Sequence, residues 1–237
     1  MGVYGGIMRE IVFDTETTGF DPTDGHRIVE IGCVELENHI PTGNTYHQYI
    51  NPERDIPQEA VAVHGLTAEF LSDKPTFGEI LSDFLEFLGD DAKLVAHNAI
   101  FDMRFVNEEL KRFGFPPLDN KRVIDTLHIA REKFPGSPAN LDALCRRFDI
   151  DNTARDFHGA LLDSELLAEV YLELLGGRQH GLVLGSDAGR DNDDNTIHLE
   201  KKRPFREPRI FSISDKEKEA HLALLNELVD PIWKEVV

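Results

Sequence analysis

Apolar positions in the first half of the chain fall in short segments that predict strands, and later ones repeat at helical spacing. The segments that favour strands lie at residues 10–14, 28–36, 45–50 and 93–96. Apolar residues at positions i, i+3, i+4, i+7, i+8 and i+11 from Phe77 predict a helix. The predicted helices span residues 77–88, 101–113, 127–133, 141–148 and 159–175.

The first three predicted strands follow one another through short connections, which favours an antiparallel meander. The residues Pro-Thr-Gly-Asn at 41–44 predict the turn between the second and third strands.

The pattern changes after Gly176 and Gly177. Residues 186–200 carry five acids, one arginine and almost no apolar side chain, so they cannot bury enough surface to fold alone. Beyond the basic stretch 201–209, Ser214 and Glu217 form a predicted capping box at the start of a helix to residue 229. The predicted organisation is a folded domain at 8–177, a flexible linker at 178–204 and a C-terminal segment at 205–237.

Composition limits the class of protein. The 237 residues are 41% hydrophobic and 29% charged, and they contain no apolar run of about 20 residues that could cross a membrane. No secretory signal is evident, and Cys33 and Cys145 lack the spacing of a metal site, so we expect a cytoplasmic protein with reduced thiols. The net charge of −19 argues against general electrostatic binding to nucleic acid. Any phosphate-bearing partner would need another source of positive charge.

Four acids and one histidine are candidates for that chemistry. Asp14 and Glu16 lie two residues apart at a strand end, so their side chains should share one face. Asp102 lies in the first turn of a predicted helix, Asp163 lies among leucines of a later one, and His158 is expected in or just before that helix's first turn. Each acid alone would more often be a cap or turn residue. Together they suit two Mg²⁺ or Mn²⁺ ions, with His158 as general base.

Three segments carry a resemblance to a known family. Residues 11–19 (IVFDTETTG), 97–102 (HNAIFD) and 158–163 (HGALLD) resemble, in order, the three motifs of the DEDDh 3′→5′ exonucleases. The resemblance implies an α/β, RNase H-like fold, a mixed β-sheet flanked by helices. It also implies two divalent metal ions, a single-stranded or frayed 3′ end as substrate, and release of nucleoside 5′-monophosphates.

Residues 59–67 are similar to the substrate loop of that family. The similarity implies that Glu59 approaches the sugar of the terminal nucleotide and that His64 approaches its phosphate or base. Thr17 and Phe105 are further candidates for this pocket. The apolar residues of the same loop fit a core position equally well.

The C-terminal part suggests protein partners. Gln179, Leu182 and Leu184 resemble the anchors of the sliding-clamp-binding peptide of bacterial replication proteins, although such a short match also arises by chance. The last segment, with Leu222, Leu225 and Trp233, resembles that of the proofreading subunits of replicative polymerases. The resemblance implies docking on the polymerase catalytic subunit; alternatively, the helix packs on its own domain. The basic stretch is either solvated charge or a contact to polymerase or DNA.

The function implied by these resemblances is proofreading, the removal of mispaired 3′-terminal nucleotides from DNA. A DEDDh exoribonuclease that trims RNA 3′ ends is the first alternative. A non-catalytic 3′-end-binding scaffold is the second, and the presence of all five chemical residues argues against it.

Overall fold

The computed structural model of the protein describes residues 8–153, 157–177 and 214–227. Contacts between Cα atoms divide the chain into two units, residues 1–184 and 185–237.

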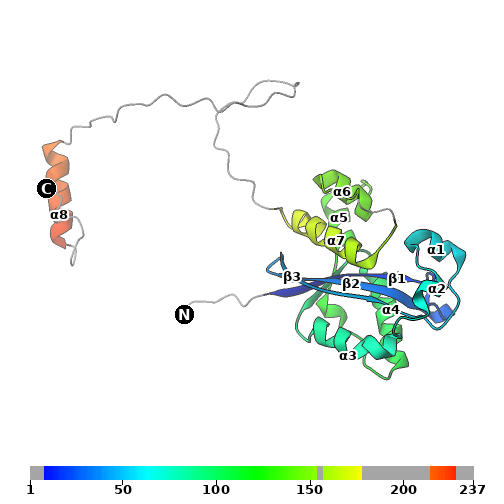
Figure 1. The fold of residues 1–237 in the computed structure, drawn as a ribbon. Coiled ribbons are helices and arrows are strands. Elements are labelled where there is room, and N and C mark those ends of the chain that lie inside the picture. Colours follow the sequence, from blue (N-terminus) through cyan, green and yellow to red (C-terminus); the bar gives the residue numbers. More distant parts are fainter. Residues whose placement is uncertain (1–7, 154–156, 178–213, 228–237) are drawn as a thin grey trace, which may run out of the picture. The chain divides into compact units, whose positions relative to one another are not determined.

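The first unit is built on a five-stranded mixed sheet with the strand order β3-β2-β1-β4-β5 (Figure 1). Its strands are β1 (Arg9–Thr17), β2 (Ile28–Glu37), β3 (Ile40–Tyr49), β4 (Lys93–Ala96) and β5 (Val123–Asp125). Strand β2 pairs antiparallel with β1 and β3, whereas β4 and β5 run parallel to β1. The predicted meander and the predicted mixed sheet are therefore confirmed.

The turn predicted at residues 41–44 is wrong. Strands β2 and β3 are joined at Asn38 and His39, whose φ angles of 50° and 67° are those of a tight two-residue hairpin turn. Pro41 pairs with Leu36 inside the ladder. Strand β3 lies at the edge of the sheet, where a proline without an N–H group is tolerated.

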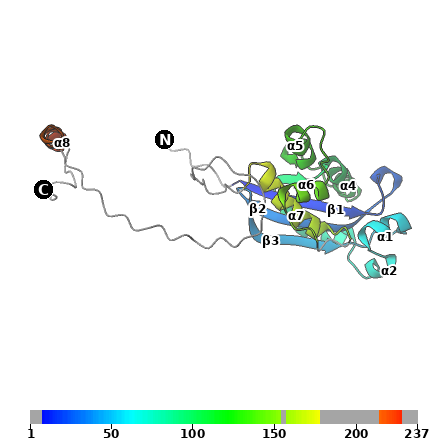
Figure 2. The same ribbon diagram turned by 90° about the horizontal axis from the view of Figure 1, so that it is seen from above.

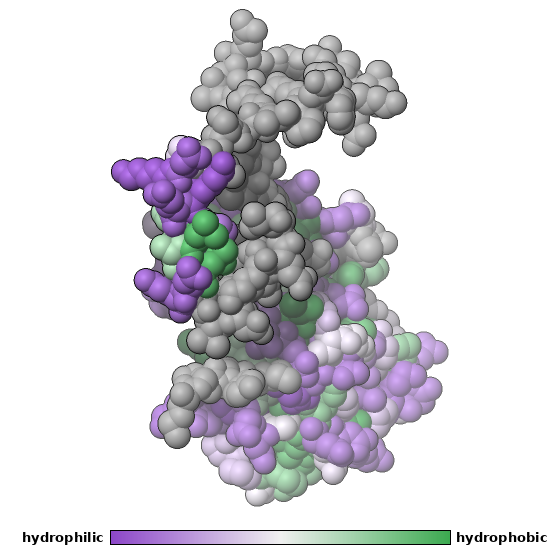
Figure 3. Space-filling model, turned by 90° about the vertical axis from the view of Figure 1, so that its left-hand side faces the viewer, coloured by the Kyte–Doolittle hydropathy of each residue, from purple (hydrophilic) through white to green (hydrophobic). Residues whose placement is uncertain are grey.

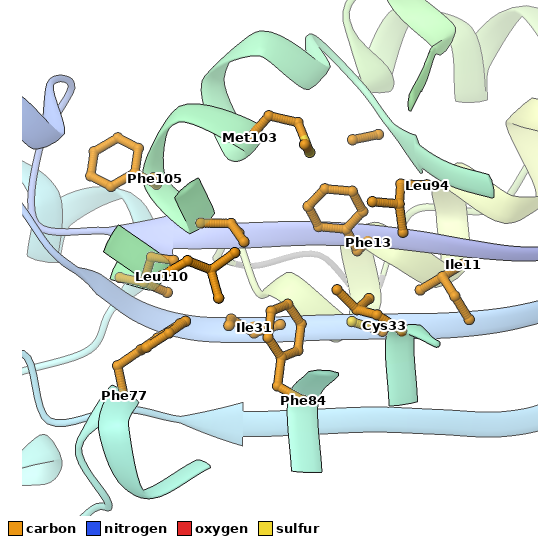
Figure 4. Close-up of a cluster of buried hydrophobic side chains, with 14 of the residues drawn as sticks. Ile11, Phe13, Ile31, Cys33, Phe77, Phe84, Leu94, Met103, Phe105 and Leu110 are labelled. Atoms are coloured by element: carbon orange, nitrogen blue, oxygen red, sulfur yellow. The ribbon is translucent and has the colours of Figure 1, made fainter. Parts of the chain in front are cut away.

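Helices cover both faces of the sheet (Figures 1 and 2). One face is covered by α3 (Phe77–Leu88) and α4 (Ala99–Arg112), and the other by α5 (Thr126–Lys133), α6 (Leu141–Phe148) and α7 (Ala160–Leu174). On the first face, Phe13 of β1 and Ile31 of β2 pack against Phe84 of α3 and Met103 of α4 (Figure 4). This apolar layer is the larger part of the core.

Two short helices, α1 (Gln58–His64) and α2 (Ala68–Leu71), lie beside the end of the sheet where β1 ends (Figure 2). The sequence did not predict these two helices, nor β5 and the 3₁₀ turns Pro22–Asp24 and Asn120–Arg122. Elements this short have too few residues to show a periodicity. The longer predicted helices are confirmed to within one or two residues at each end. Figure 3 shows one face of the molecule, on which hydrophilic side chains predominate among the coloured residues.

The second unit contains α8 (Asp215–Glu227). The predicted capping box is present, since the Ser214 N–H group donates to the Glu217 carboxylate at 2.9 Å and the Glu217 N–H group donates to the Ser214 hydroxyl oxygen at 3.4 Å. Leu222 is 52% exposed and Leu225 is 5% exposed. The other predicted partner-binding residues, Gln179, Leu182, Leu184 and Trp233, lie outside the described residues, as does the predicted linker. Within the described ranges, no helix is long and apolar enough to span a bilayer.

Candidate active site

Strand β1 presents its side chains alternately to the two helical layers. Val12 packs with the α7 layer, whereas Ile11 and Phe13 pack with the α3 and α4 layer. By the same alternation Asp14 and Glu16 face α7. Pairing with β4 ends at Val12, so the last part of β1 extends beyond its parallel neighbour. The end of the sheet at which β1 ends is the edge on which the candidate site lies.

Helix α7 approaches this part of the sheet closely because of a glycine. Gly32 of β2 lies opposite Asp14, and a Cβ atom there would collide with the backbone of Ala160 and Leu161. The Ser164 hydroxyl donates to the Gly32 carbonyl at 2.9 Å. The first turn of α7 therefore rests directly on β2, and it carries Asp163 to the edge where Asp14 lies.

Three side chains converge at this edge. One ligand atom each from Glu16, His158 and Asp163 lies within 4.8 Å of the other two. His158 directly precedes the helix cap Gly159, and its Nδ1 atom lies 3.3 Å from Asp163 Oδ2. Glu16 and Asp163 are buried, while the His158 side chain is half exposed. The two carboxylates offer the oxygen ligands that a hard divalent cation prefers, and the imidazole lies beside them.

Asp102 reaches the same region from the opposite face of the sheet. It lies in the first turn of α4, and its Oδ1 atom accepts hydrogen bonds from the Thr15 N–H group at 3.1 Å and the Thr15 hydroxyl at 2.7 Å. Burial raises the pKa of Asp102 to about 7, against the opposing effect of the Thr15 hydrogen bonds. A cation at this edge would favour the ionised form.

A cavity of about 370 Å³ adjoins these residues. Thr17, Glu59 and His64, three residues predicted for a substrate pocket, line it together with Glu16. The sequence did not predict the other lining residues, which include Thr18, Gly19, Phe20, His26 and Phe101. Of these five, Phe101 belongs to the second motif and Thr18 and Gly19 to the first, so these three carried a signal.

Phe105 does not line this cavity, so its prediction as a pocket residue is wrong. Its side chain is 1% exposed and belongs to the core between the sheet and α4. Phe101, one helical turn earlier with its ring 5.0 Å away, lines the cavity instead. The helix begins at Ala99, so residue 101 lies at the edge of the sheet and residue 105 over its interior.

His64 ends helix α1 and is buried. Its Nδ1 atom accepts the Leu66 N–H group at 3.0 Å, and Gly65 follows with a φ of 74°. The Nε2 atom is buried and has no hydrogen-bond partner among the described residues. Burial lowers the pKa of His64, which favours the neutral ring. The Val63 carbonyl accepts the His158 N–H group at 3.2 Å and so joins the α1 region to the third motif.

The fold and the site define the class of protein. The Exonuclease (RNase_T) family matches residues 11–171, and the chain belongs to this family. The nuclease domain of 3′hExo, described as a DEDDh family member bound to rAMP, has the same fold, with a TM-score of 0.61, 21% identity and coverage of 72% of this chain and 93% of that one. The predicted RNase H-like fold is confirmed. The DEDDh pattern implies dependence on a divalent metal ion, which the donor set at this edge fits.

The curated relatives are more specific. The chain is 58% identical over 198 residues to the DNA polymerase III subunit epsilon of Rickettsia conorii, covering 82% of this chain and 86% of that protein. It is 42% identical over 229 residues to the DNA polymerase III subunit epsilon of Escherichia coli K12, covering 93% of each. Within the exonucleases, the chain thus groups with the epsilon subunits of DNA polymerase III.

Proposed function

We propose that this protein is the proofreading 3′→5′ exodeoxyribonuclease of a bacterial replicative DNA polymerase. It removes mispaired 3′-terminal nucleotides as 5′-monophosphates in the cytoplasm. The observation that carries the proposal is the convergence of Glu16, His158 and Asp163 at the edge of the sheet, beside a cavity large enough for a nucleotide. The names of the relatives support the choice of polymerase III among exonucleases.

In this proposal Asp14, Glu16, Asp102 and Asp163 hold two divalent ions, Mg²⁺ or Mn²⁺. When bound, such ions supply an activated water and stabilise the leaving oxygen of a phosphodiester. His158 accepts the proton of the attacking water. Its ring lies beside Asp163 and is half exposed, so solvent can reach it.

The cavity is the proposed site of the terminal nucleotide. In this proposal Glu59 contacts the sugar and His64 the phosphate or base, in keeping with the resemblance of residues 59–67 to a substrate loop, and Thr17 lines the same pocket. Phe20 and Phe101 contribute an apolar wall, which suits a base. The expected substrate is a frayed or single-stranded 3′ terminus.

The experiment for this proposal compares 5′-labelled single-stranded DNA and RNA of one sequence, with Mg²⁺, Mn²⁺ or a chelator. We expect stepwise shortening of DNA from its 3′ end that requires metal, is lost in His158→Ala and persists in the control His128→Ala, a histidine of α5 paired with Glu132. Much faster cleavage of RNA would instead support an exoribonuclease. No cleavage of either would support a non-catalytic scaffold that binds 3′ ends.

We also propose that residues 205–237 bind the catalytic subunit of the polymerase. Helix α8 exposes Leu222, and the similarity to the Escherichia coli subunit covers 93% of the chain, which is more than residues 8–177 can account for. The net charge of −19 adds a reason, because a polymerase that holds the primer would supply the 3′ end at high effective concentration. Residues 179–184 are a candidate contact to a sliding clamp.

The test of the polymerase contact is co-purification with the catalytic subunit. A chain ending at Gly177 should keep its hydrolysis of single-stranded DNA and lose the association. The full chain with Leu222→Asp should weaken the association, whereas Lys218→Gln on the same helix serves as its control. Co-purification of the shortened chain would contradict the proposal.

A further inference from the structure

Thr15 lies between two candidate metal ligands but acts on a third. Asp14 and Glu16 face α7, while Thr15 points to the other face of the sheet, toward α4. Both its N–H group and its hydroxyl donate to Asp102 Oδ1, at 3.1 and 2.7 Å. These bonds connect β1 to α4 across 87 residues of sequence, and both side chains are buried.

The two hydrogen bonds restrict how Asp102 can bind a cation. A carboxylate oxygen offers about two lone pairs, and Thr15 occupies both of them on Oδ1. Oδ2 is then the oxygen turned toward any ion at the edge. Without the hydroxyl, only the longer bond from the Thr15 N–H group would hold Oδ1, and the carboxylate could turn more easily about its last bond, which has a broad, two-fold torsional profile.

We propose that Thr15 is a positioning residue that orients the Asp102 carboxylate to present Oδ2 to a metal ion. The inference rests on the proposed role of Asp102 as a metal ligand. The three residues 14–16 then serve the site from both faces of the sheet, two as ligands and the middle one as the support of a ligand on α4. Groups that orient metal ligands commonly change metal affinity or activity by about 10–100-fold when they are removed.

The variants isolate the hydroxyl. Thr15→Val keeps the branched shape and strand preference but cannot donate to Asp102, whereas Thr15→Ser keeps the donor. Thr42→Val is the matched control, because Thr42 also lies on a strand of this sheet and its hydroxyl donates to a carboxylate, that of Glu35, at 2.8 Å. Asp102→Asn tests the proposed ligand itself.

Two quantities are measured on the full chain. The first is the affinity for Mn²⁺, monitored through the spectroscopic signal of free Mn²⁺, and the second is the Mg²⁺ concentration that gives half-maximal hydrolysis. We expect Thr15→Val to weaken Mn²⁺ binding and to raise that Mg²⁺ concentration by about 10-fold or more. Thr15→Ser keeps the hydroxyl donor, so both quantities should stay within about 3-fold of those of the unmodified chain. Thr42→Val should leave both quantities unchanged.

Two results would overturn the inference. Thr15→Val could bind Mn²⁺ like the unmodified chain, or Thr15→Ser could lose as much as Thr15→Val, which would assign the effect to packing of the methyl group. If Thr15→Val does not fold, the comparison of Thr15→Ser with Thr15→Ala decides between the same outcomes. Normal Mn²⁺ binding by Asp102→Asn would instead contradict the role of Asp102 as a metal ligand. If Asp102→Asn loses Mn²⁺ binding while Thr15→Val keeps it, the metal site stands and only the Thr15 inference fails.

Discussion

Strand β1 carries a buried glutamate near each end, and the two have different surroundings. Glu10 is 0% exposed and Glu16 is 8% exposed. Glu10 accepts the Tyr171 hydroxyl at 2.8 Å and the His39 N–H group at 2.9 Å, and the His39 ring lies beside it. Glu16 instead lies within 4.8 Å of a second carboxylate, that of Asp163, and of His158.

The difference separates a carboxylate that serves the fold from one that belongs to the proposed metal site. Burying a charge is costly unless hydrogen bonds or opposite charges compensate, and at Glu10 donors from two other elements do so. At the other end the fold brings carboxylates together, although like charges repel. A divalent cation relieves that repulsion, so the cluster around Glu16 indicates a binding site more strongly than burial alone does.

Removing an acid at the Glu16 end should have the largest effect on activity. Asp163→Asn should lower hydrolysis of single-stranded DNA by about 100-fold or more, because metal ions contribute several kcal/mol to stabilising a transition state and 1.4 kcal/mol is tenfold in rate. The melting temperature without metal should stay the same or rise, since one of the repelling charges is gone. Activity assays and thermal unfolding of the same preparation test this. Near-normal hydrolysis would contradict the assignment.

Gly32→Ala should have the next largest effect, by moving a ligand without changing one. The new methyl group would displace the first turn of α7, which carries Asp163. Because ångström-scale displacement in a catalytic site can cost about 100-fold, we expect a loss of hydrolysis of about 10–100-fold with a lower melting temperature. Gly43→Ala is the control, because a Cβ there meets nothing within 4 Å, although its φ of 89° adds some strain. Equal effects of the two substitutions would exclude the close approach of α7 as the cause.

Sequence periodicity predicted one part of this site and missed another for identifiable reasons. The period of two in β1 placed Asp14 and Glu16 on one face, and the helical spacing after Gly159 placed His158 before the helix. The support of Asp102 by Thr15 joins residues far apart in sequence, so no local pattern carries it. The turn at residues 41–44 failed because turn-like residues also fit an exposed edge strand.

At the opposite end of β1, Glu10→Gln should reduce stability and leave the chemistry intact. The amide keeps one acceptor oxygen, but its NH₂ group then faces a donor from Tyr171 or His39. We expect a loss of about 1–3 kcal/mol in the free energy of unfolding, the usual cost of an unsatisfied buried group. Hydrolysis per folded molecule should be unchanged. Denaturant unfolding and activity assays measure the two quantities, with the exposed Glu37→Gln as control. If Glu10→Gln lost activity at unchanged stability, Glu10 would have a role in the chemistry, and the two ends of β1 would not differ in function.

The smallest expected effect concerns the pH dependence of stability at the site end. Burial lowers the pKa of His64, while the charge of Glu30 and the nearby Thr17 backbone act in the opposite direction and His158 acts in the same direction. In the unfolded chain this histidine takes up a proton below a pH of about 6.5, while in the folded chain it stays neutral to a lower pH. Its contribution to stability is therefore present above about pH 6.5 and is lost as the pH falls.

His64→Asn isolates this contribution, because the Asn side-chain oxygen can accept the Leu66 N–H group in place of Nδ1 but does not titrate. Between about pH 7.5 and 5.5 the free energy of unfolding of the unmodified chain should fall more than that of the variant. His128→Gln, at an exposed position, should follow the unmodified chain. A larger fall in His64→Asn than in the unmodified chain would mean that His64 is stabilised by protonation, as a contact to a carboxylate would require, and not held neutral by burial.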